Sequence, residues 1–185
     1  MDTEAELRAD CARCQGLCCV ALPFDRSAWF AFDKLAHVPC DHLNERSRCA
    51  IHAELGERGQ AGCQAYDCYG AGQRVCGELF GGRSWRREPE LLAAMCDALP
   101  GLRDVHELRL LLRQAGQLEL SGPARARCQQ LLHELEPACG YTPARLAHLN
   151  LEQLRRETFA YLRSLRGVAG VRRPRRRLPL VSPSG

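Results

Sequence analysis

The sequence lacks the features that mark several common protein classes. It contains no Gly-x-x-x-x-Gly-Lys-Ser/Thr phosphate loop and no Gly-x-Ser-x-Gly elbow, so nucleotide binding and serine-hydrolase chemistry gain no support. No stretch approaches the ~20 apolar residues of a membrane-spanning helix. The first residues, Met1 to Glu6, are acidic and polar and do not resemble a signal peptide. We therefore expect a cytoplasmic protein without membrane contact.

Two residue types are scarce. Aromatic residues make up 6% of the chain, and the apolar content consequently depends on leucine and alanine, which favours helices over sheets. Lysine occurs once, at Lys34, among 26 basic residues, a skew typical of a GC-rich genome. The surplus of positive charge lies in the Arg- and Pro-rich tail, residues 169–185. That tail cannot bury much surface, so we predict that it is disordered.

Cysteine, in contrast, is abundant. Twelve cysteines in 185 residues indicate either a disulfide scaffold or metal ligation, and an expected reducing compartment favours metal. The run from Cys11 through Cys14 to Cys18 and Cys19 places four thiols close together. A Cys-x-x-Cys pair lets two sulfurs reach one ion without backbone strain. Since adjacent cysteines in an extended chain point apart, either Cys18 and Cys19 serve two centres or one of them is buried in the core.

Further cysteines follow beside turn-forming residues, with Cys76 as a reserve ligand. Eight thiols suffice for two four-thiolate sites, and three histidines, His37, His42 and His52, are available as imidazole ligands. For each histidine alone, an ordinary surface or core role is the commoner case. We predict zinc or an iron–sulfur cluster as the cofactor. The predicted ligands are Cys11, Cys14, Cys18, Cys19, Cys40, Cys49, Cys63 and Cys68.

The remaining cysteines, Cys96, Cys128 and Cys139, lack partners at metal spacing and fit buried free thiols. The overall prediction is a mainly α protein: a small irregular cysteine-rich metal-binding unit, then a helical bundle or cap, then the tail. Residues 8–80 form the predicted metal-binding domain, 81–89 a linker or exposed loop, and 90–168 the helical region.

Several helices are predicted from apolar spacing and from stop signals. One short helix is expected near Ser27, where an N-cap precedes apolar residues. In the helical region the first expected helix runs from Leu91 to a stop at Pro100–Gly101, and the second from Val105 to a break at Gly116. The third follows Ser121-Gly122-Pro123, contains Cys128 and stops at Pro137. The fourth begins at the N-cap Thr142, with Pro143 at the first helical position, and continues with one interruption to Leu165.

The cysteine pattern resembles the YkgJ-type cysteine-cluster family, described as a zinc- or iron-chelating domain. The resemblance covers roughly residues 8–70. It is carried by Cys11-x2-Cys14-x3-Cys18-Cys19, then Cys40-Asp-His-Leu, then Arg48-Cys49-Ala-Ile-His and Arg58-Gly-Gln-Ala-Gly-Cys63. In this chain His52 stands where the family usually has tyrosine. The resemblance implies metal chelation and names no reaction.

A closer likeness is to the cysteine-rich N-terminal segment of some actinobacterial pentapeptide-repeat proteins. It is carried by Gly16-Leu-Cys-Cys-Val-Ala-Leu-Pro-Phe24, by Gly62-Cys-Gln-Ala-Tyr-Asp-Cys-Tyr-Gly-Ala-Gly-Gln73 and by Ser84-Trp-Arg-Arg87. Such proteins continue into a β-helix of five-residue repeats, which this sequence does not contain. The chain therefore looks like a stand-alone or truncated version.

Three functions remain open from the sequence. The first is a structural or redox/regulatory metal-binding module that acts on a protein partner through its helical region. The second is a metal-dependent enzyme, an oxidoreductase or a protein-modifying one, which abundant thiols disfavour because they can close every coordination position. The third is a thiol-based redox sensor, in which Arg13 favours thiolates at the neighbouring pair. Contact of the arginine tail with nucleic acid is a weaker alternative.

Overall fold

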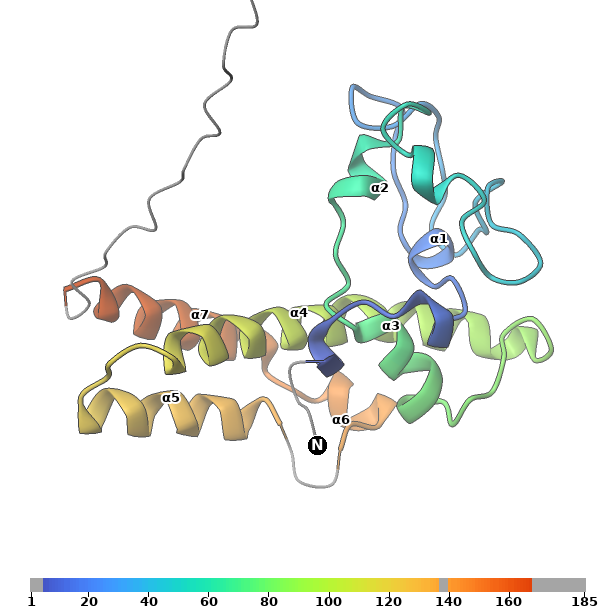
Figure 1. Cartoon of the computed structure of the whole chain (residues 1–185). Coiled ribbons are helices and arrows are strands. Elements are labelled where there is room, and N and C mark those ends of the chain that lie inside the picture. Colours follow the sequence, from blue (N-terminus) through green and yellow to red (C-terminus); the bar gives the residue numbers. More distant parts are fainter. Residues whose placement is uncertain (1–4, 137–139, 168–185) are drawn as a thin grey trace, which may run out of the picture.

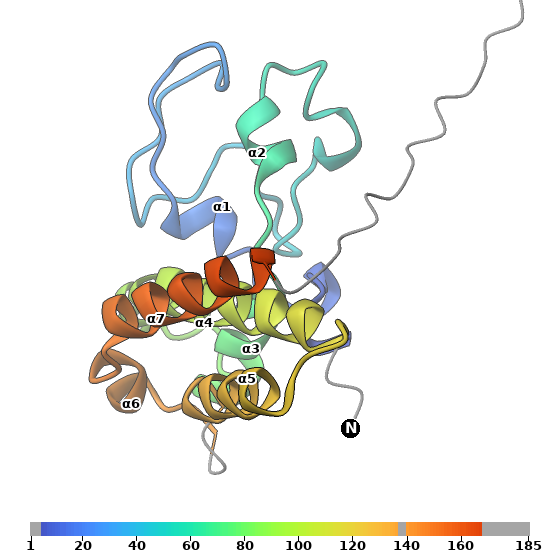
Figure 2. The same ribbon diagram turned by 90° about the vertical axis from the view of Figure 1, so that its left-hand side faces the viewer.

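The computed structural model describes residues 5–136 and 140–167 (Figure 1). This part of the chain is mainly helical, as predicted. Its β-type pairing consists of two isolated antiparallel bridges, Phe24–Lys34 and Leu43–Cys49. The long helix α4 lies at the centre, with the loops around α1 and α2 on one side of it and α5, α6 and α7 packed around the rest (Figures 1 and 2).

The helices differ in length between the two halves of the chain. The C-terminal half contains α4 (Leu92–Gly116), α5 (Gly122–Glu134), α6 (Pro143–Ala147) and α7 (Leu151–Ser164), followed by the 3-10 turn η6 (Leu165–Gly167). The N-terminal half contains only short elements: η1 (Ala5–Leu7), η2 (Cys11–Arg13), α1 (Cys18–Ala21), η3 (His52–Glu54), α2 (Ala61–Ala65), α3 (Ala71–Arg74), the π-helical turn η4 (Val75–Leu79) and η5 (Pro89–Leu91).

The predicted stop at Pro100–Gly101 is wrong, because α4 runs through it as one helix. A proline inside a helix costs roughly 3 kcal/mol through the lost hydrogen bond and the ring clash. On either side of it, Leu99 and Leu102 are completely buried, and burying each leucine recovers about 1.5–3 kcal/mol. Gly101 lies against Leu146 of α6, whose side chain would stand 3.7 Å from an added Cβ. Tertiary packing therefore outweighs the local stop signal.

Most other helix predictions agree with the structure. Helix α4 ends at Gly116, and the Thr142 hydroxyl caps α6 by accepting a hydrogen bond from the Arg145 N–H at 3.1 Å. The expected interruption lies between α6 and α7. The stop at Pro137 and the tail fall outside the described residues.

The short helix expected near Ser27 is wrong. Its residues instead form a loop in which the Ser27 N–H donates to the Phe30 carbonyl at 2.9 Å. The rings of Phe24 and Phe30 stack with their centroids 4.2 Å apart, and the bridge between Phe24 and Lys34 closes the loop. Cross-loop stacking thus replaces the apolar helix face that the pattern indicated.

The hydrophobic core includes residues from both halves. Leu17, Val20 and Val75 are fully buried and belong to the same cluster as the leucines of α4. Trp85, in the expected linker, is 7% exposed and donates its indole N–H to the Gln15 carbonyl at 3.0 Å. The division into domains stays a prediction, and the structure adds that the two halves share one core. None of the helices described is both long and apolar enough to span a bilayer.

A buried histidine connects α4 to the cysteine-rich half. His106 is fully buried, with Nδ1 2.6 Å from the Tyr69 carbonyl oxygen and Nε2 3.4 Å from a nitrogen of Arg74. Because a guanidinium only donates, Nε2 accepts and Nδ1–H donates to Tyr69. This arrangement holds the neutral imidazole, and burial lowers the pKa of His106 from 6.5 to about 4.

Acid should therefore destabilise the fold through His106. Between pH 6.5 and pH 4 the imidazole is protonated in the unfolded chain but stays neutral in the native protein. The free energy of unfolding therefore falls as the pH falls. At pH 5 the loss relative to pH 8 is about 2 kcal/mol for a shift of this size. Urea unfolding at both pH values should show that loss in the wild type and much less of it in His106→Gln. Equal losses in the two proteins would contradict the assignment.

Candidate metal centre

Seven of the eight predicted ligands line a single cavity of about 420 Å³ in the cysteine-rich half. The eighth, Cys14, lies just outside this lining, against the start of α3. The other wall residues are mainly apolar and include Phe24, Phe30 and Ile51. The cysteines of the wall are Cys11, Cys18, Cys19, Cys40, Cys49, Cys63 and Cys68.

Helix α1 carries two of these thiols. It follows Gly16, whose φ of +70° favours glycine and whose added Cβ would lie 2.6 Å from a methyl group of Leu43. Val20 in the same helix is fully buried and anchors it in the core. The Sγ atoms of Cys18 and Cys19 are 4.0 Å apart. The core thus fixes this pair of sulfurs at the cavity wall.

Backbone pairing brings the next two cysteines to the same wall. The Cys40 N–H donates to the Cys19 carbonyl at 2.9 Å, and Cys40 in turn accepts from the Leu43 N–H at 2.8 Å. Leu43 then forms an antiparallel bridge with Cys49. These bonds hold Cys19, Cys40 and Cys49 together, although Cys19 and Cys49 lie 30 positions apart in the sequence.

The last two cysteines come from the segment around α2 and α3. Cys63 lies in α2, with its sulfur 3.9 Å from the Gln60 side-chain oxygen. Cys68 precedes Gly70, which has a φ of +79° and whose added Cβ would lie only 2.1 Å from the Glu6 carbonyl oxygen. Only glycine fits that turn. It lets the chain reverse from Cys68 into α3 and keeps the sulfur facing the cavity.

Several sulfurs have hydrogen-bond donors that favour the thiolate. The Cys76 thiol, followed by the backbone N–H groups of Leu17 and Gly16, lowers the pKa of Cys14 to about 6 against the opposing effect of burial. Backbone donors from Gly72 and Gly70 act in the same direction on Cys68, although burial leaves its pKa raised. Such N–H···S bonds are those that tune thiolate-bound metals.

Burial and neighbouring thiols oppose ionisation of Cys11, Cys40 and Cys63. Burial, followed by neighbouring cysteines, raises the pKa of Cys11 and raises that of Cys63 to about 11. Burial likewise raises the pKa of Cys40, with Cys49 adding to the effect. Several thiolates around one cavity repel one another unless a cation lies between them. A bound metal ion supplies that charge and deprotonates a coordinating thiol.

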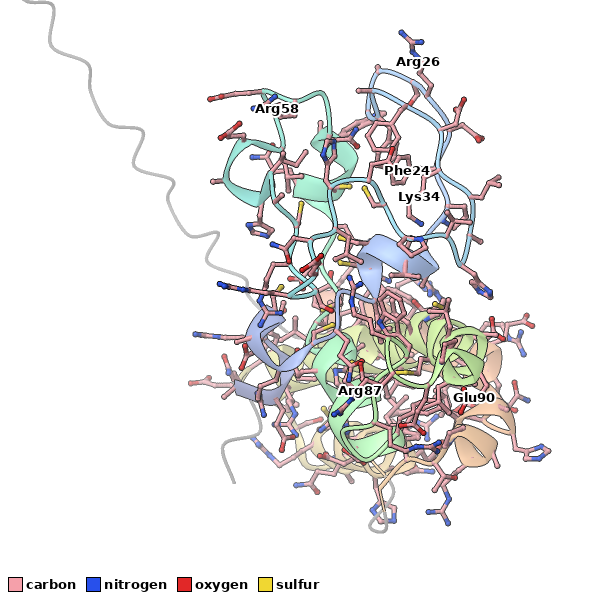
Figure 3. All side chains as sticks on the ribbon, turned by 90° about the vertical axis from the view of Figure 1, so that its right-hand side faces the viewer. Phe24, Arg26, Lys34, Arg58, Arg87 and Glu90 are labelled. Carbon is pink, nitrogen blue, oxygen red and sulfur yellow. The ribbon has the colours of Figure 1, made fainter. Side chains whose placement is uncertain are left out.

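Two cations lie beside the thiols, and the sequence pattern pointed to neither. Lys34 is 7% exposed and donates from Nζ to the carbonyls of Val20, Leu22 and Leu35 at 2.9, 2.8 and 3.1 Å. In Figure 3 it lies next to Phe24, close to several sulfur atoms. Its positive charge partly offsets the rise that burial causes in the pKa of Cys40. The only feature of the sequence that singled out Lys34 was the scarcity of lysine, and this scarcity does not indicate a role for the residue.

The second cation is Arg48. It donates to the Cys14 carbonyl at 3.1 Å and to the Ala12 carbonyl at 2.9 Å. Its charge adds to the lowering of the Cys14 pKa and partly offsets the rise that burial causes in the pKa of Cys11. Arg13, which the sequence suggested for this role, pairs instead with Asp10 at 2.8 Å. The nearest effective charge therefore comes from a residue distant in sequence.

Two buried polar groups at the cavity have no partner among the described residues. Gln60 is 2% exposed, and its side-chain nitrogen makes no hydrogen bond. The Tyr66 hydroxyl is likewise buried without a partner. Both residues line the cavity. A buried donor without an acceptor costs about 1–3 kcal/mol. A ligand that carries acceptor atoms, such as thiolates or inorganic sulfide, would satisfy both donors.

The sulfurs surround a space and do not converge on one point. Among the described residues, no three Cys, His, Asp or Glu side chains are placed to hold a single ion. His42 and His52 line the cavity, whereas His37 contacts Asp97 at 3.3 Å. A tetrahedral zinc site with Zn–S bonds of about 2.3 Å needs its sulfurs closer together. The cavity thus suits a larger group, or loops that close around ions.

The other cysteines lie outside the cavity wall. Cys76 is 2% exposed, accepts from the Gln15 N–H at 3.3 Å and faces Cys14. Cys96 and Cys128 are buried in the core, as expected for free thiols. Cys139 falls outside the described residues. The cysteines that the structure describes are all free thiols.

Comparison with known proteins adds one relative. No protein-family profile and no solved structure matches this chain. The chain is 38% identical over 157 residues to the "Uncharacterized protein YybG" of Bacillus subtilis (strain 168). The match covers 85% of this chain and 56% of the relative. The chain thus spans little more than half the length of this curated relative, and the YkgJ-type resemblance stays an expectation.

Proposed function

We propose that the cysteine-rich half binds a thiolate-ligated metal centre, zinc or an iron–sulfur cluster, and serves as a structural or redox/regulatory module. The observation that carries the proposal is the convergence of seven thiols, spread between Cys11 and Cys68, on one cavity. Between Ala21 and Ala71, the segment that supplies Cys40, Cys49, Cys63 and Cys68, no buried residue belongs to the core cluster. Ligand binding would supply the missing folding free energy, as it does in other small metal domains.

The surroundings of the cavity support a metal over a set of free thiols. Free cysteines usually scatter through a core as small apolar groups. Here seven of them line one cavity together with the unpartnered donors of Gln60 and Tyr66. The cations Lys34 and Arg48 and backbone N–H donors act on thiols of this set from outside the lining. Each of these groups interacts favourably with thiolates or with sulfide, and none stabilises a neutral thiol comparably.

Anaerobic purification followed by elemental analysis and a visible spectrum tests the proposal. We expect either zinc in a colourless protein, or iron with inorganic sulfide and broad visible absorption. The double variant Cys14→Ser/Cys18→Ser should contain less metal, because both positions lie in the predicted ligand set. The matched control is Cys96→Ser/Cys128→Ser, which changes two thiols outside the cavity and should keep the full metal content. Metal-free wild type would overturn the proposal.

A redox sensor is the second candidate, and one observation favours it. The Cys76 thiol and backbone donors lower the pKa of Cys14, which favours its reactive thiolate form. Peroxide would then release the metal reversibly, whereas a structural centre would resist or unfold. Catalysis has less support because the thiols can close every coordination position. A protein partner, a contact with nucleic acid and a cytoplasmic location stay predictions of the sequence.

A further inference from the structure

The turn that follows Cys68 contains a strained residue. Tyr69 has a φ of +48° and Gly70 a φ of +79°, so two consecutive residues lie in the left-handed region. Glycine adopts this conformation freely, whereas a bulky residue such as tyrosine adopts it only when surrounding contacts hold it there. Strain of this kind is frequent beside binding sites. Because Cys68 lines the cavity, the strained turn lies directly next to a predicted ligand.

Helix α4 supplies contacts that hold this turn. The Arg103 Nε–H donates to the Asp67 carbonyl at 3.1 Å, and the His106 Nδ1–H donates to the Tyr69 carbonyl at 2.6 Å. These two carbonyls belong to the residues on either side of Cys68. Residues three apart on a helix are neighbours on its surface, so Arg103 and His106 act on the turn from one face of α4. One turn of α4 thus fixes the backbone before and after the cysteine.

Arg103 also contacts side chains around this turn. Its guanidinium carbon lies 5.1 Å from the ring centroid of Tyr69 and 5.9 Å from that of Tyr66, which are cation–π distances. Its Nη1 donates to the carboxylates of Asp104 at 3.0 Å and Glu107 at 3.1 Å. The two carboxylates of α4 therefore orient a guanidinium that contacts one carbonyl and two rings of the cysteine-rich half.

Two groups of the same segment lie at the proposed centre. Tyr66 and Cys68 both line the cavity, and the Tyr66 hydroxyl is buried without a partner among the described residues. Arg103 is not part of the lining, because it contacts the segment from the side of α4. A movement of the turn would consequently displace a predicted ligand and an unpartnered donor together.

We propose that Arg103 is a positioning residue for the metal centre, because it holds the strained turn at Tyr69 and thereby keeps the Cys68 sulfur at the cavity wall. The inference rests on the proposed function. His106 supports the same turn from one helical turn further along α4. The helical half contains none of the predicted ligands, and these two side chains connect it to one of them.

Pulsed alkylation tests the role of Arg103 whatever the metal content of the protein. Wild type, Arg103→Met and Arg127→Met, as purified anaerobically, receive a short pulse of iodoacetamide, and mass spectrometry measures the rate at each cysteine. Cys68 should react about tenfold faster in Arg103→Met than in wild type, a factor that corresponds to about 1.4 kcal/mol. Cys49, which lies on the same wall and is held by its bridge to Leu43, should keep its wild-type rate.

Arg127 provides the matched control. It is a half-buried arginine of α5 that pairs with Glu134 and Glu157, neither of which lines the cavity. Arg127→Met should therefore leave the rates at Cys49 and Cys68 unchanged. An unchanged rate at Cys68 in Arg103→Met would overturn the proposal. An equal rise at both cysteines would also overturn it, because that pattern indicates a general loosening of the fold.

A spectroscopic measurement separates positioning from general stability. Cobalt(II) is added to protein from which a chelator has removed the metal, and the charge-transfer absorption of thiolate-bound cobalt is recorded. Arg103→Met should absorb less per bound cobalt than wild type, because Cys68 leaves the centre, whereas Arg127→Met should match wild type. Equal absorption per cobalt in Arg103→Met and wild type would contradict the positioning role.

The two possible failures are distinguishable. Wild type that contains no metal as purified and binds no cobalt would contradict the proposed function. The alkylation rates would still decide whether Arg103 holds the turn at Cys68, because they are measured on the protein with or without metal.

Discussion

Replacing Gly72 with alanine should weaken metal binding in the cysteine-rich half, even though no predicted ligand is changed. The added methyl would lie 2.8 Å from the Cys14 sulfur, closer than such atoms approach without a shift. Overpacking of this kind typically costs about 1–3 kcal/mol. We expect the metal content to fall and the free energy of unfolding to decrease by that amount, as measured by elemental analysis and urea unfolding.

The control for this variant is Gly77→Ala. Gly77 lies in the next turn, η4, and an added Cβ there would meet nothing within 4 Å. Because alanine is a better helix former than glycine, this change should leave the metal unaffected and stabilise the fold by about 0.5–1 kcal/mol. Both substitutions add the same methyl group. If Gly72→Ala lowers the free energy of unfolding and Gly77→Ala raises it, the difference is due to the contact with the Cys14 sulfur. Full metal content in Gly72→Ala would contradict the placement of Cys14.

Lys34→Met should have the largest effect on stability. Methionine preserves much of the side-chain length but leaves the carbonyls of Val20, Leu22 and Leu35 without their shared donor. Each unsatisfied buried acceptor costs about 1–3 kcal/mol. Because the loop can relax partially, we expect the free energy of unfolding to fall by about 2–4 kcal/mol in total. Metal affinity should also fall, because the thiolates of Cys19 and Cys40 lose a neighbouring positive charge.

Urea unfolding and zinc competition against a chromophoric chelator would measure the two effects. Arg58→Met provides the control, since Arg58 is an exposed residue on the outer loop that pairs only with Glu54 (Figure 3). An exposed pair of this kind contributes less than about 1 kcal/mol, so this variant should behave almost as wild type. Equal stability of Lys34→Met and Arg58→Met would show that the buried ammonium has no structural role.

The helical half was largely predictable because its signals are local. The Thr142–Pro143 start and the Gly116 end follow from backbone chemistry within one turn of the chain. Pro100 shows the limit of that reasoning. Its local cost is real, but the burial that outweighs it comes from helices distant in sequence, which no spacing rule within α4 records.

The sequence predicted the cysteines of the candidate site but not the other residues around them. The clustering of cysteines selected eight thiols, seven of which line the cavity, because few other roles require so many thiols. Lys34, Gln60 and Tyr66 could not be selected. Each matters only because the fold brings it against carbonyls or sulfurs that the linear order does not place beside it. Lysine, glutamine and tyrosine occur in many settings, so only the folded structure shows that these three lie at the cavity. Clustered cysteines, in contrast, already indicate metal ligation by their number in the sequence.

The hydrogen bond between the Trp85 indole and the Gln15 carbonyl has an optical consequence. Gln15 follows Cys14 directly, so a buried fluorophore contacts the residue next to a predicted ligand of the proposed metal centre. The other tryptophan, Trp29, is 59% exposed on an outer loop, and water already surrounds much of its ring. Emission of the two would separate in wavelength. The molecule thus contains its own probe: quenching or a red shift of the bluer component would follow the filling and emptying of that centre in real time, without a label.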